Sequence, residues 1–246
     1  MSANDAGTAG SGQVIGILLA AGRGRRFDAT GRRNKLLQCL ADGGGAGESG
    51  GESVGESVGG AVAESVGGAV GESVAVLSAR PLLACLPRVL AVVPSGSAEL
   101  AAMLENSGCE VTMCADADGG MGHSLAHAVR HSQAWAPAGW LIALADMPWV
   151  QLSTVQAVLA AVAGNPSGIV APCWQGQRGN PVFIPRQYQA DLLALHGDQG
   201  ARALLQRYPP HLIAVEDAGI VSDIDTVADL GKTALAKLKL ISNSEN

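Results

Sequence analysis

The sequence predicts an α/β protein in which a mostly parallel sheet lies between two layers of helices. Short, uncharged runs rich in branched aliphatic residues, such as residues 14–20, have the pattern of strands buried on both faces. Longer apolar runs with helical spacing alternate with them, which favours right-handed βαβ units. The 246 residues, 48% of them hydrophobic, are enough to bury a large core in one domain.

In the first half of the chain, an apolar strand at 14–20 ends at two glycines, and a short apolar strand is expected at 36–40. A helical pattern over 74–86 stops at Pro87, because proline cannot continue a helix. The next expected elements are a buried strand at 88–93, a helix at 98–107 that ends at Gly108, a strand at 109–114 and a helix opened by glycines at 119–133.

In the second half, an uncharged strand at 140–145 leads through a proline-containing turn to a helix at 151–163. The later expected elements are strands at 169–173 and 180–184, helices at 187–196 and 200–208, a strand at 212–216 and a closing helix at 227–240. In sheets of this kind, ligands bind beyond the carboxyl ends of the strands. We therefore look for a site directly after the strands at 14–20 and 140–145.

Three segments are expected to differ from the folded domain at 14–240. Residues 1–13 are rich in Ser, Ala and Gly and lack the apolar stretch of a signal peptide, so we expect a disordered tail, with a second tail at 241–246. Residues 42–72 contain an eight-residue tandem repeat, ESVGGAVA then ESVGGAVG. Because this unit is too short and too rich in glycine to bury a face, we expect a flexible insertion.

Composition excludes several classes of function. The net charge is −6 and 3% of residues are aromatic, which disfavours binding of nucleic acid through phosphates or stacked bases. The five cysteines include no C-x-x-C pair, so we expect free thiols, no structural zinc and a reducing, cytoplasmic location. No apolar run reaches membrane-spanning length, so no membrane partner is expected.

The strand at 14–20 runs directly into a loop rich in glycine and arginine, LAAGRGRR at residues 19–26. Its glycines let the backbone approach an oxyanion, and the arginines at positions 23, 25 and 26 supply forked donors that match phosphate. A basic surface loop is the alternative, but such a loop has no reason to follow a buried strand so abruptly. The loop matches neither the dinucleotide G-x-G-x-x-G pattern, because position 27 is Phe27, nor the P-loop pattern, because no G-K-[ST] follows.

The loop resembles the L-A-A-G-x-G-x-R loop of the MobA-like nucleotidyltransferases, the relatives of the molybdenum cofactor guanylyl- and cytidylyltransferases. The family lysine corresponds here to Lys35, after a longer gap than usual, and Arg32 or Arg33 could share its role. The resemblance implies a Rossmann-like sandwich of the nucleotide-diphospho-sugar transferase type. It also implies nucleotide contacts from Leu19, Ala20, Ala21, Gly22, Gly24, Arg25, Arg26 and Lys35.

A single carboxylate, Asp146, ends the strand at 140–145, in the sequence LADMP. It could cap the following helix, but Gln151 and Ser153 lie nearer to that start. Metal binding is favoured, because Mg2+ takes one or two carboxylates together with substrate phosphates. The segment resembles the family's L-x-D-M-P, which implies that Asp146 binds Mg2+.

Two further carboxylates, Asp223 and Asp225, occur in the sequence DIDTVADL and lie on the same face of an extended chain. Asp225 or Thr226 could cap the closing helix, so Asp223 is the preferred metal ligand, although spacing leaves both open. The segment resembles the family's D-I-D-T-P-E-D-L, with Val227 in place of the proline. The resemblance implies that an aspartate here completes the Mg2+ site.

The sequence GGMGHSL at 119–125 resembles the family's G-M-G-x-S-L, which implies nucleotide contacts from Gly122 and Ser124. Glycines before a helix let its amino end approach a ligand, and such ends attract anions. The histidines at positions 123, 127 and 131 lie four apart on the same helix. An H-x-x-x-H pair could bind zinc, but without a third ligand motif we prefer a solvent-facing stripe.

Two later motifs, GQRGNPV at 176–182 and GDQGAR at 197–202, resemble the family's G-x-R-G-x-P and G-D-x-G-A-R. Asn180 replaces the histidine of many relatives, and a hairpin turn is the structural alternative for the glycines. Arginines in these motifs would suit a dianionic phosphate. The resemblance implies contacts with the second substrate from Arg178, Gly179, Asn180, Pro181, Asp198 and Arg202.

Together the five motifs imply Mg2+-dependent attack of a substrate phosphate on the α-phosphorus of a nucleoside triphosphate, with Arg26, Lys35 and Asp146 as catalytic residues. Ala21 stands where guanylyltransferase relatives carry glycine, which resembles the cytidylyltransferase branch. We therefore expect CTP and a molybdopterin-type acceptor as substrates, with a molybdoenzyme apoprotein as a further candidate partner. The alternatives are GTP, a sugar phosphate or other small phosphorylated acceptor, or a non-catalytic carrier of the molybdenum cofactor.

Overall fold

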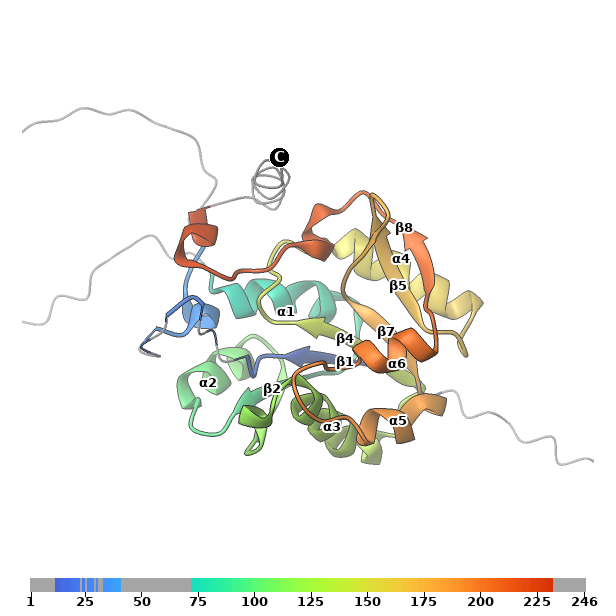
Figure 1. Ribbon diagram of the computed structural model, residues 1–246, viewed down its shortest axis with the longest axis horizontal. Helices are drawn as coiled ribbons and strands as arrows, with labels where there is room; N and C mark the ends of the chain where they lie inside the picture. Colours follow the sequence, from blue (N-terminus) through green and yellow to red (C-terminus); the bar gives the residue numbers. More distant parts are fainter. Residues whose placement is uncertain are drawn as a thin grey trace, which may run out of the picture.

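The computed structural model describes residues 12–22, 24, 26–28, 30, 33–40 and 72–231. In this part of the chain, one mixed eight-stranded sheet lies between two layers of helices, which confirms the predicted fold class (Figure 1). Several predictions fall outside the described residues: the tails at 1–11 and 241–246, the insertion at 42–71, the helix end at 232–240, and the arginines at positions 23, 25 and 32.

The centre of the sheet is parallel. Strand β1 (Val14–Leu19) lies between β2 (Val89–Pro94) and β4 (Gly139–Leu144), and β3 (Glu110–Cys114) pairs with the outer side of β2. The other half is mixed: β7 (Val182–Pro185) is antiparallel to β4 and β5 (Val170–Trp174), β6 (Gln177–Arg178) is antiparallel to β5, and β8 (His211–Ala214) is parallel to β5.

The two faces of the sheet carry separate cores. Helices α1 (Val74–Cys85), α2 (Ala98–Asn106) and α4 (Leu152–Gly164) contribute to one, and α3 (Met121–Ser132), α5 (Gln189–Leu193) and α6 (Arg202–Arg207) to the other. Along β1, Leu18 belongs to the first core and its neighbours Ile17 and Leu19 to the second, as the two-residue period of a strand requires. Each buried aliphatic side chain of this kind contributes about 1.5–3 kcal/mol.

The ends of β1 and β4 position the site. Leu19 and Leu144, the last residues of the two strands, are paired in register. The amide of Ala145 then donates to the carbonyl of Leu19 at 3.0 Å, and the Ser78 hydroxyl of α1 donates to the carbonyl of Ala145 at 2.9 Å. The glycine-rich loop and Asp146 therefore leave the sheet side by side, from a rigid edge.

The expected strand at 36–40 is wrong. Residues Lys35–Leu37 form a short 3-10 helix, whose first turn is capped by the Asn34 side chain, and Cys39 makes a single antiparallel bridge with Ser73. A five-residue apolar run carries too little periodicity to separate a helical turn from a strand, and the capping asparagine decides here. The remaining 3-10 segments are Ala117–Gly119, Gln133–Trp135, Arg186–Tyr188, Ala218–Val221 and Val227–Gly231.

Other elements differ from expectation mainly in length. The predicted helix at 187–196 is a 3-10 turn followed by the five-residue α5, and the closing helix begins as a 3-10 turn. Strand β6 was not expected: Gln175 and Gly176 both have positive φ and close a hairpin between β5 and β6. The hairpin alternative therefore holds for Gly176.

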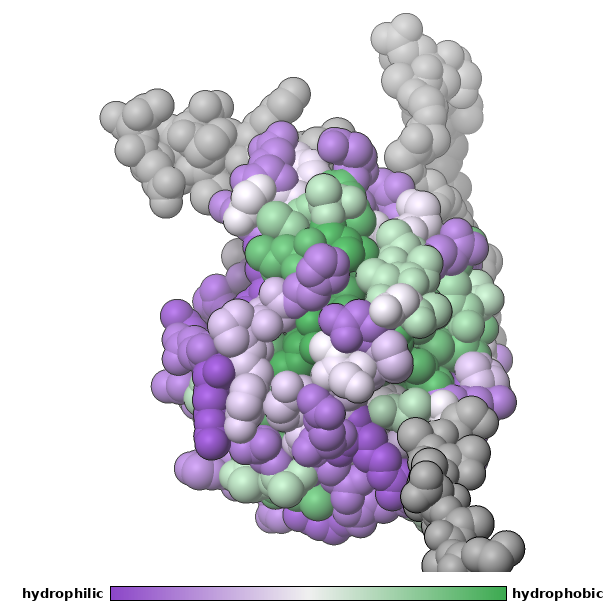
Figure 2. All heavy atoms as spheres, turned by 90° about the vertical axis from the view of Figure 1, so that its right-hand side faces the viewer, coloured by the Kyte–Doolittle hydropathy of each residue, from purple (hydrophilic) through white to green (hydrophobic). Residues whose placement is uncertain are grey.

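The surface beside β8 and α4 mixes apolar with polar residues (Figure 2). Leu212 on the edge strand β8 and Leu152 at the start of α4 are among the exposed apolar side chains. Within the residues that the structure describes, no helix combines the length and apolarity that crossing a membrane would need.

Candidate active site

A cleft of about 430 Å³ opens at the carboxyl ends of β1 and β4, within the size range of small-molecule sites. It is formed by the loop after β1, the 3-10 helix at 35–37, the amino end of α3, Asp146 and the segment 223–225. Its lining residues are Leu19, Ala21, Gly22, Gly24, Arg26, Lys35, Leu36, Ala117, Gly120, Met121, Ser124, Leu144, Asp146, Asp198, Asp223 and Asp225.

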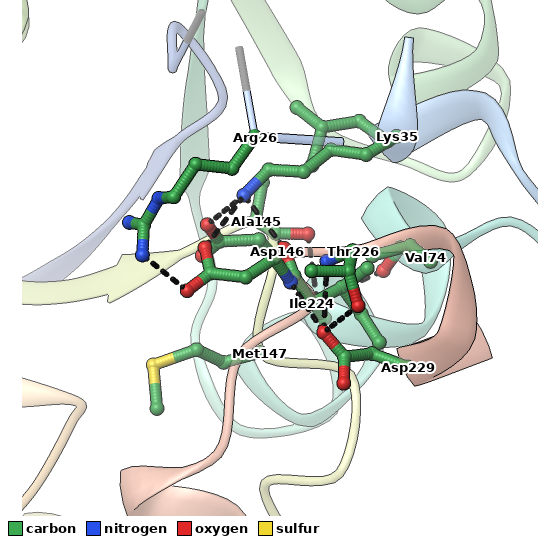
Figure 3. Close-up of polar contacts among 12 residues, drawn as sticks. Arg26, Lys35, Val74, Ala145, Asp146, Met147, Ile224, Thr226 and Asp229 are labelled. Atoms are coloured by element: carbon green, nitrogen blue, oxygen red, sulfur yellow. Dashed lines mark hydrogen bonds and ion pairs between the residues drawn. The ribbon is translucent and has the colours of Figure 1, made fainter. Parts of the chain in front are cut away.

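Lys35 is the most buried charged side chain of the cleft, with 7% of its surface exposed. Its Nζ donates to Asp146 Oδ2 at 2.7 Å and to the carbonyl oxygen of Ile224 at 2.7 Å (Figure 3). It also lies 3.9 Å from Asp225 Oδ1. The stem of the lysine lies along Gly24. A buried ammonium needs such acceptors, and here they come from two segments that are far apart in the sequence.

Arg26 approaches the same carboxylates from the outer side of the cleft. Its Nη1 lies 2.8 Å from Asp225 Oδ2, and 78% of the arginine side chain is exposed. An exposed ion pair of this kind adds little to stability, so its main effect is to orient the guanidinium over the cleft.

The segment at 223–229 is tied to the strand edge by its backbone. The amide of Ile224 donates to the carbonyl of Asp146 at 2.8 Å, and the Ile224 side chain is fully buried. The carboxylate of Asp229 accepts from the amides of Asp225 and Thr226 and from the Thr226 hydroxyl. Asp229, in the first turn of this segment, thus reaches back to the residues that precede it, as the acidic residue of a capping box does.

Thr226 directly precedes this turn and donates from its amide to Asp229, so the hypothesis that Asp225 or Thr226 caps the last helix stays a prediction. The Asp225 carboxylate pairs with Arg26 and lies 3.9 Å from the Lys35 ammonium, so it faces the cleft and is as suitable a metal ligand as Asp223. Both carboxylates line the cleft with Asp146.

The donor set suits Mg2+, which prefers hard oxygen ligands and uses one or two carboxylates with substrate phosphates. The Lys35 ammonium already draws Asp146 and Asp225 toward one cationic point. The described lining residues include four carboxylates but only two cationic side chains, so a bound triphosphate would need an added cation. The described residues hold no ready group of three His, Cys, Asp or Glu ligands, and a phosphate-completed site does not require one.

The amino end of α3 lines the opposite end of the cleft. Ser124 is 2% exposed and lines it, and apart from the weak thiol of Cys114 the Ser124 hydroxyl has no hydrogen-bond partner among the described residues. Gly122 does not line the cleft: it is buried against the backbone of His196, and its amide donates to the carbonyl of Gly197 at 2.8 Å. Likewise Ala20, predicted to contact the nucleotide, is 1% exposed and packs in the core.

The residues predicted to contact the second substrate do not come together. Asp198 lines the main cleft, whereas Asn180 and Pro181 line a small separate cavity beside Met147. Gly179 packs against the carbonyl of Ile220, where a side chain would clash. Arg178 and Arg202 are exposed and line neither space.

Each of the three histidines of α3 contacts another residue of the protein. His123 Nδ1 accepts from the amide of Gly197 at 3.2 Å, and His127 Nε2 lies 2.9 Å from the Thr112 hydroxyl. His131 packs edge-on against Trp135. The stripe is thus exposed only in part, with His127 half-buried, and burial lowers the pKa of His127.

Sequence reasoning missed Gly120, Ala117 and Met121, which line the cleft before and at the start of α3. The double glycine at 119–120 was the available signal, because Gly120 has φ 108° and lets the chain enter the helix beside the cleft.

The sequence profile of one family, described as the MobA-like NTP transferase domain, matches residues 16–212. The chain belongs to this family. The matched range includes the glycine-rich loop, Lys35, Asp146 and Asp198, whereas the segment at 223–229 that closes the cleft lies beyond it.

The individual relatives of this MobA-like chain described below are at most 30% identical to it over the residues that match. Purine catabolism protein PucB of Bacillus subtilis (strain 168) is 30% identical over 117 residues, which are 46% of this chain and 56% of PucB. The match thus spans little more than half the length of that curated relative.

Solved structures with similar folds include Rv0371c from Mycobacterium tuberculosis H37Rv, with a TM-score of 0.65 and 21% identity over 89% of this chain and 96% of that one. A manganese complex of Rv0371c matches with a TM-score of 0.58 and 19% identity over 95% of this chain and all of that one. Molybdopterin-guanine dinucleotide biosynthesis protein A from Archaeoglobus fulgidus matches with a TM-score of 0.55 and 16% identity over 94% of this chain and all of that one. At these identities, the likeness establishes the fold alone.

Proposed function

We propose that this nucleotidyltransferase transfers CMP from CTP to a molybdopterin-type acceptor, releases pyrophosphate and uses Mg2+. The observation that carries the proposal is the meeting of a glycine-rich loop, Lys35 and three carboxylates in one cleft. Arginine and lysine side chains match phosphate groups, and carboxylates match a divalent cation. Transfer between phosphates needs such positioned charges more than it needs a side-chain nucleophile.

In this proposal, the loop backbone at Gly22 and Gly24 approaches the triphosphate, and Arg26 and Lys35 donate to its β- and γ-phosphates. The same two cations stabilise the negative charge that develops on the leaving pyrophosphate. Asp146, with Asp223 and Asp225, would hold Mg2+. When bound, the ion supplies charge neutralisation at the reacting phosphates. The manganese complex of the structural neighbour Rv0371c supports use of a divalent cation.

The choice of CTP rests on Ala21, which is 9% exposed and lines the cleft directly after β1. Its methyl group narrows the space where a glycine would leave room for a larger base. The name of the Archaeoglobus fulgidus neighbour supports a molybdopterin-linked acceptor, but it also names guanine. GTP is therefore the first alternative nucleotide, and a sugar phosphate the first alternative acceptor. A non-catalytic carrier is disfavoured because it has no use for paired cations and carboxylates at one cleft.

The test is release of pyrophosphate from each of the four triphosphates, with molybdopterin-bound molybdenum or a sugar phosphate as acceptor. We expect turnover with CTP and the molybdopterin acceptor, and a loss of roughly a hundredfold or more in Asp146→Asn, because a metal-binding carboxylate is removed. Turnover only with a sugar phosphate would move the chain to another substrate class. A folded Asp146→Asn protein with normal turnover would refute the assigned role of this carboxylate.

A further inference from the structure

The loop that contains Asp198 is bound directly to the amino end of α3. The carbonyl of Gly197 accepts from the amide of Gly122, and the amide of Gly197 donates to His123 Nδ1. A Cβ added to Gly120 would clash with the Asp198 carboxylate. The carboxylate is therefore held over the first turn of α3, although its motif lies about 75 residues further along the chain.

This end of the cleft is unsuited to a phosphate group. The amides of a first helical turn normally attract anions. Here the amide of Gly122 is bonded to Gly197, and the amides of His123 and Ser124 reach the carbonyl of Gly120 at 3.2 and 3.4 Å. The Asp198 carboxylate adds a negative charge at the same point, which would repel a phosphate. A ligand group here must bring a hydrogen-bond donor.

The Ser124 hydroxyl is a second polar group at this end that could bind a ligand. This hydroxyl is buried and lines the cleft, and apart from the weak thiol of Cys114 it has no hydrogen-bond partner within the described residues. Burying a hydroxyl without a partner is unfavourable, so a ligand that completes it gains affinity. Its neighbour Cys114 offers only a weakly bonding thiol, and burial raises the pKa of that thiol.

The other walls at this end are apolar, formed by Leu19, Ala117 and Met121. Arg26 and Lys35 lie with Asp146 and Asp225 at the opposite end, where their ion pairs are made. Apolar walls with a few polar groups suit a flat heteroaromatic ring, whereas the paired charges suit the triphosphate. The base therefore belongs at the α3 end.

We propose that Asp198 is a specificity-determining residue that accepts a hydrogen bond from the exocyclic amino group of the nucleobase, with the Ser124 hydroxyl bonding the same ring. The inference rests on the proposed nucleotidyl transfer. It assigns to the nucleotide a residue that the motif resemblance gave to the second substrate. Cytosine presents an amino donor where uracil presents a carbonyl acceptor, and a carboxylate accepts from the first and repels the second.

The experiment measures equilibrium binding and kcat/KM for two pairs of triphosphates. UTP has a carbonyl and a ring N–H where CTP has an amino group and an unprotonated ring nitrogen, and ITP lacks the amino group of GTP. We expect the wild-type chain to favour the amino-bearing member of the pair it uses by roughly tenfold or more, the effect of a hydrogen bond to a charged group. In Asp198→Asn the amide can also donate to a carbonyl, so this ratio should fall to near one.

Asp191→Asn is the matched control, because this carboxylate on α5 pairs with Arg207 and lines no part of the cleft. Its ratios should equal those of the wild type. If Asp198 serves only to balance the charge at the start of α3, the Asn variant will lower thermal stability and bind all four triphosphates equally less well, and the inference fails. Binding without discrimination in the wild type also overturns it, but leaves nucleotidyl transfer standing. A wild type that binds no triphosphate overturns both.

Discussion

Asp217 and Asp229 are both nearly fully buried, with 2% and 4% of their surface exposed. Each carboxylate accepts from two backbone amides and one threonine hydroxyl. Asp217 does so at the start of α4, where it caps the helix from a distant part of the chain, and Asp229 does so beside the cleft. The two carboxylates thus accept from the same kinds of donor and are buried to a similar degree, but they lie in different parts of the fold.

We expect Asp217→Asn and Asp229→Asn each to lower the free energy of unfolding by about 1–3 kcal/mol, because each removes an acceptor from a buried set of donors. Only Asp229→Asn should also reduce turnover and the affinity for Mg2+, since Asp229 fixes the backbone that carries Asp225. Urea unfolding and pyrophosphate release measure the two effects. Equal loss of turnover in both variants would mean that destabilisation alone explains it.

Ala21→Gly should relax the nucleotide preference in part. The methyl group of Ala21 lines the cleft directly after β1, and its removal widens the space beside the base. We expect kcat/KM for GTP to rise relative to CTP, without full reversal, because the rest of the base pocket is unchanged. The four triphosphates are compared in wild type and variant. A wild type that already prefers GTP would contradict the role given to Ala21.

The cleft-lining position of Asp146 follows from the sequence, because a residue directly after an apolar strand lies at the carboxyl edge of the sheet. Lys35, Asp223 and Asp225 do not directly follow strands, and their positions in the cleft agree with what the motif resemblance implied. The capping role of Asp229 does not follow from the sequence, since it depends on a 3-10 turn that the pattern did not distinguish from an α-helix. The packing of Gly122 against the backbone of His196 could not be predicted either, because contacts between distant loops leave no periodic signal in the sequence.

At the scale of elements, the parallel strands were the most predictable feature. Val14–Leu19 and Gly139–Leu144 are buried on both faces, so their sequences are uncharged throughout and leave no alternative. Short elements were the least predictable: Lys35–Leu37 and Gln177–Arg178 are defined by a capping side chain and a turn, not by their own composition.

Helix α3 and strand β3 are joined by a bond that should respond to pH. His127 Nε2 lies 2.9 Å from the Thr112 hydroxyl, and burial, with the nearby charges of His131 and Arg130, lowers the pKa of His127 below 6.5. The unfolded chain therefore binds a proton more readily than the folded one. Stability should fall as pH drops from about 6.5 through the lower folded-state pKa, and level off below it.

His127→Gln should flatten this part of the profile, because glutamine does not titrate but can still bond to Thr112. Urea unfolding at a series of pH values, in wild type and variant, measures the difference between the two slopes. Identical slopes would show that other groups cause the pH dependence.

At the scale of the whole molecule, the chain leaves the described fold at residue 40 and re-enters it at residue 72. The flanks lie together: Cys39 bridges Ser73, and the amide of Val74 donates to the carbonyl of Gln38 at 2.9 Å. A short connection can therefore replace the longer one without moving either flank.

We propose that the repeat segment is dispensable, and that the domain at 14–240 folds without it. Deleting residues 50–71 should change the melting temperature little and preserve turnover, because shortening a loop changes its closure entropy only slowly. Thermal melting and pyrophosphate release test this. Loss of cooperative unfolding in the deletion variant would mean that the segment packs against the domain.

The Lys35 ammonium, held between Asp146, Asp225 and the carbonyl of Ile224, acts as a counter-ion that is covalently tethered to the chain. The carboxylates are thus kept together without any dissociable ion. A divalent cation arriving by itself would have to compete with this tethered charge. A cation that arrives together with a triphosphate gives the ammonium new anionic partners in exchange, so the cleft should favour joint entry of metal and nucleotide over stepwise loading.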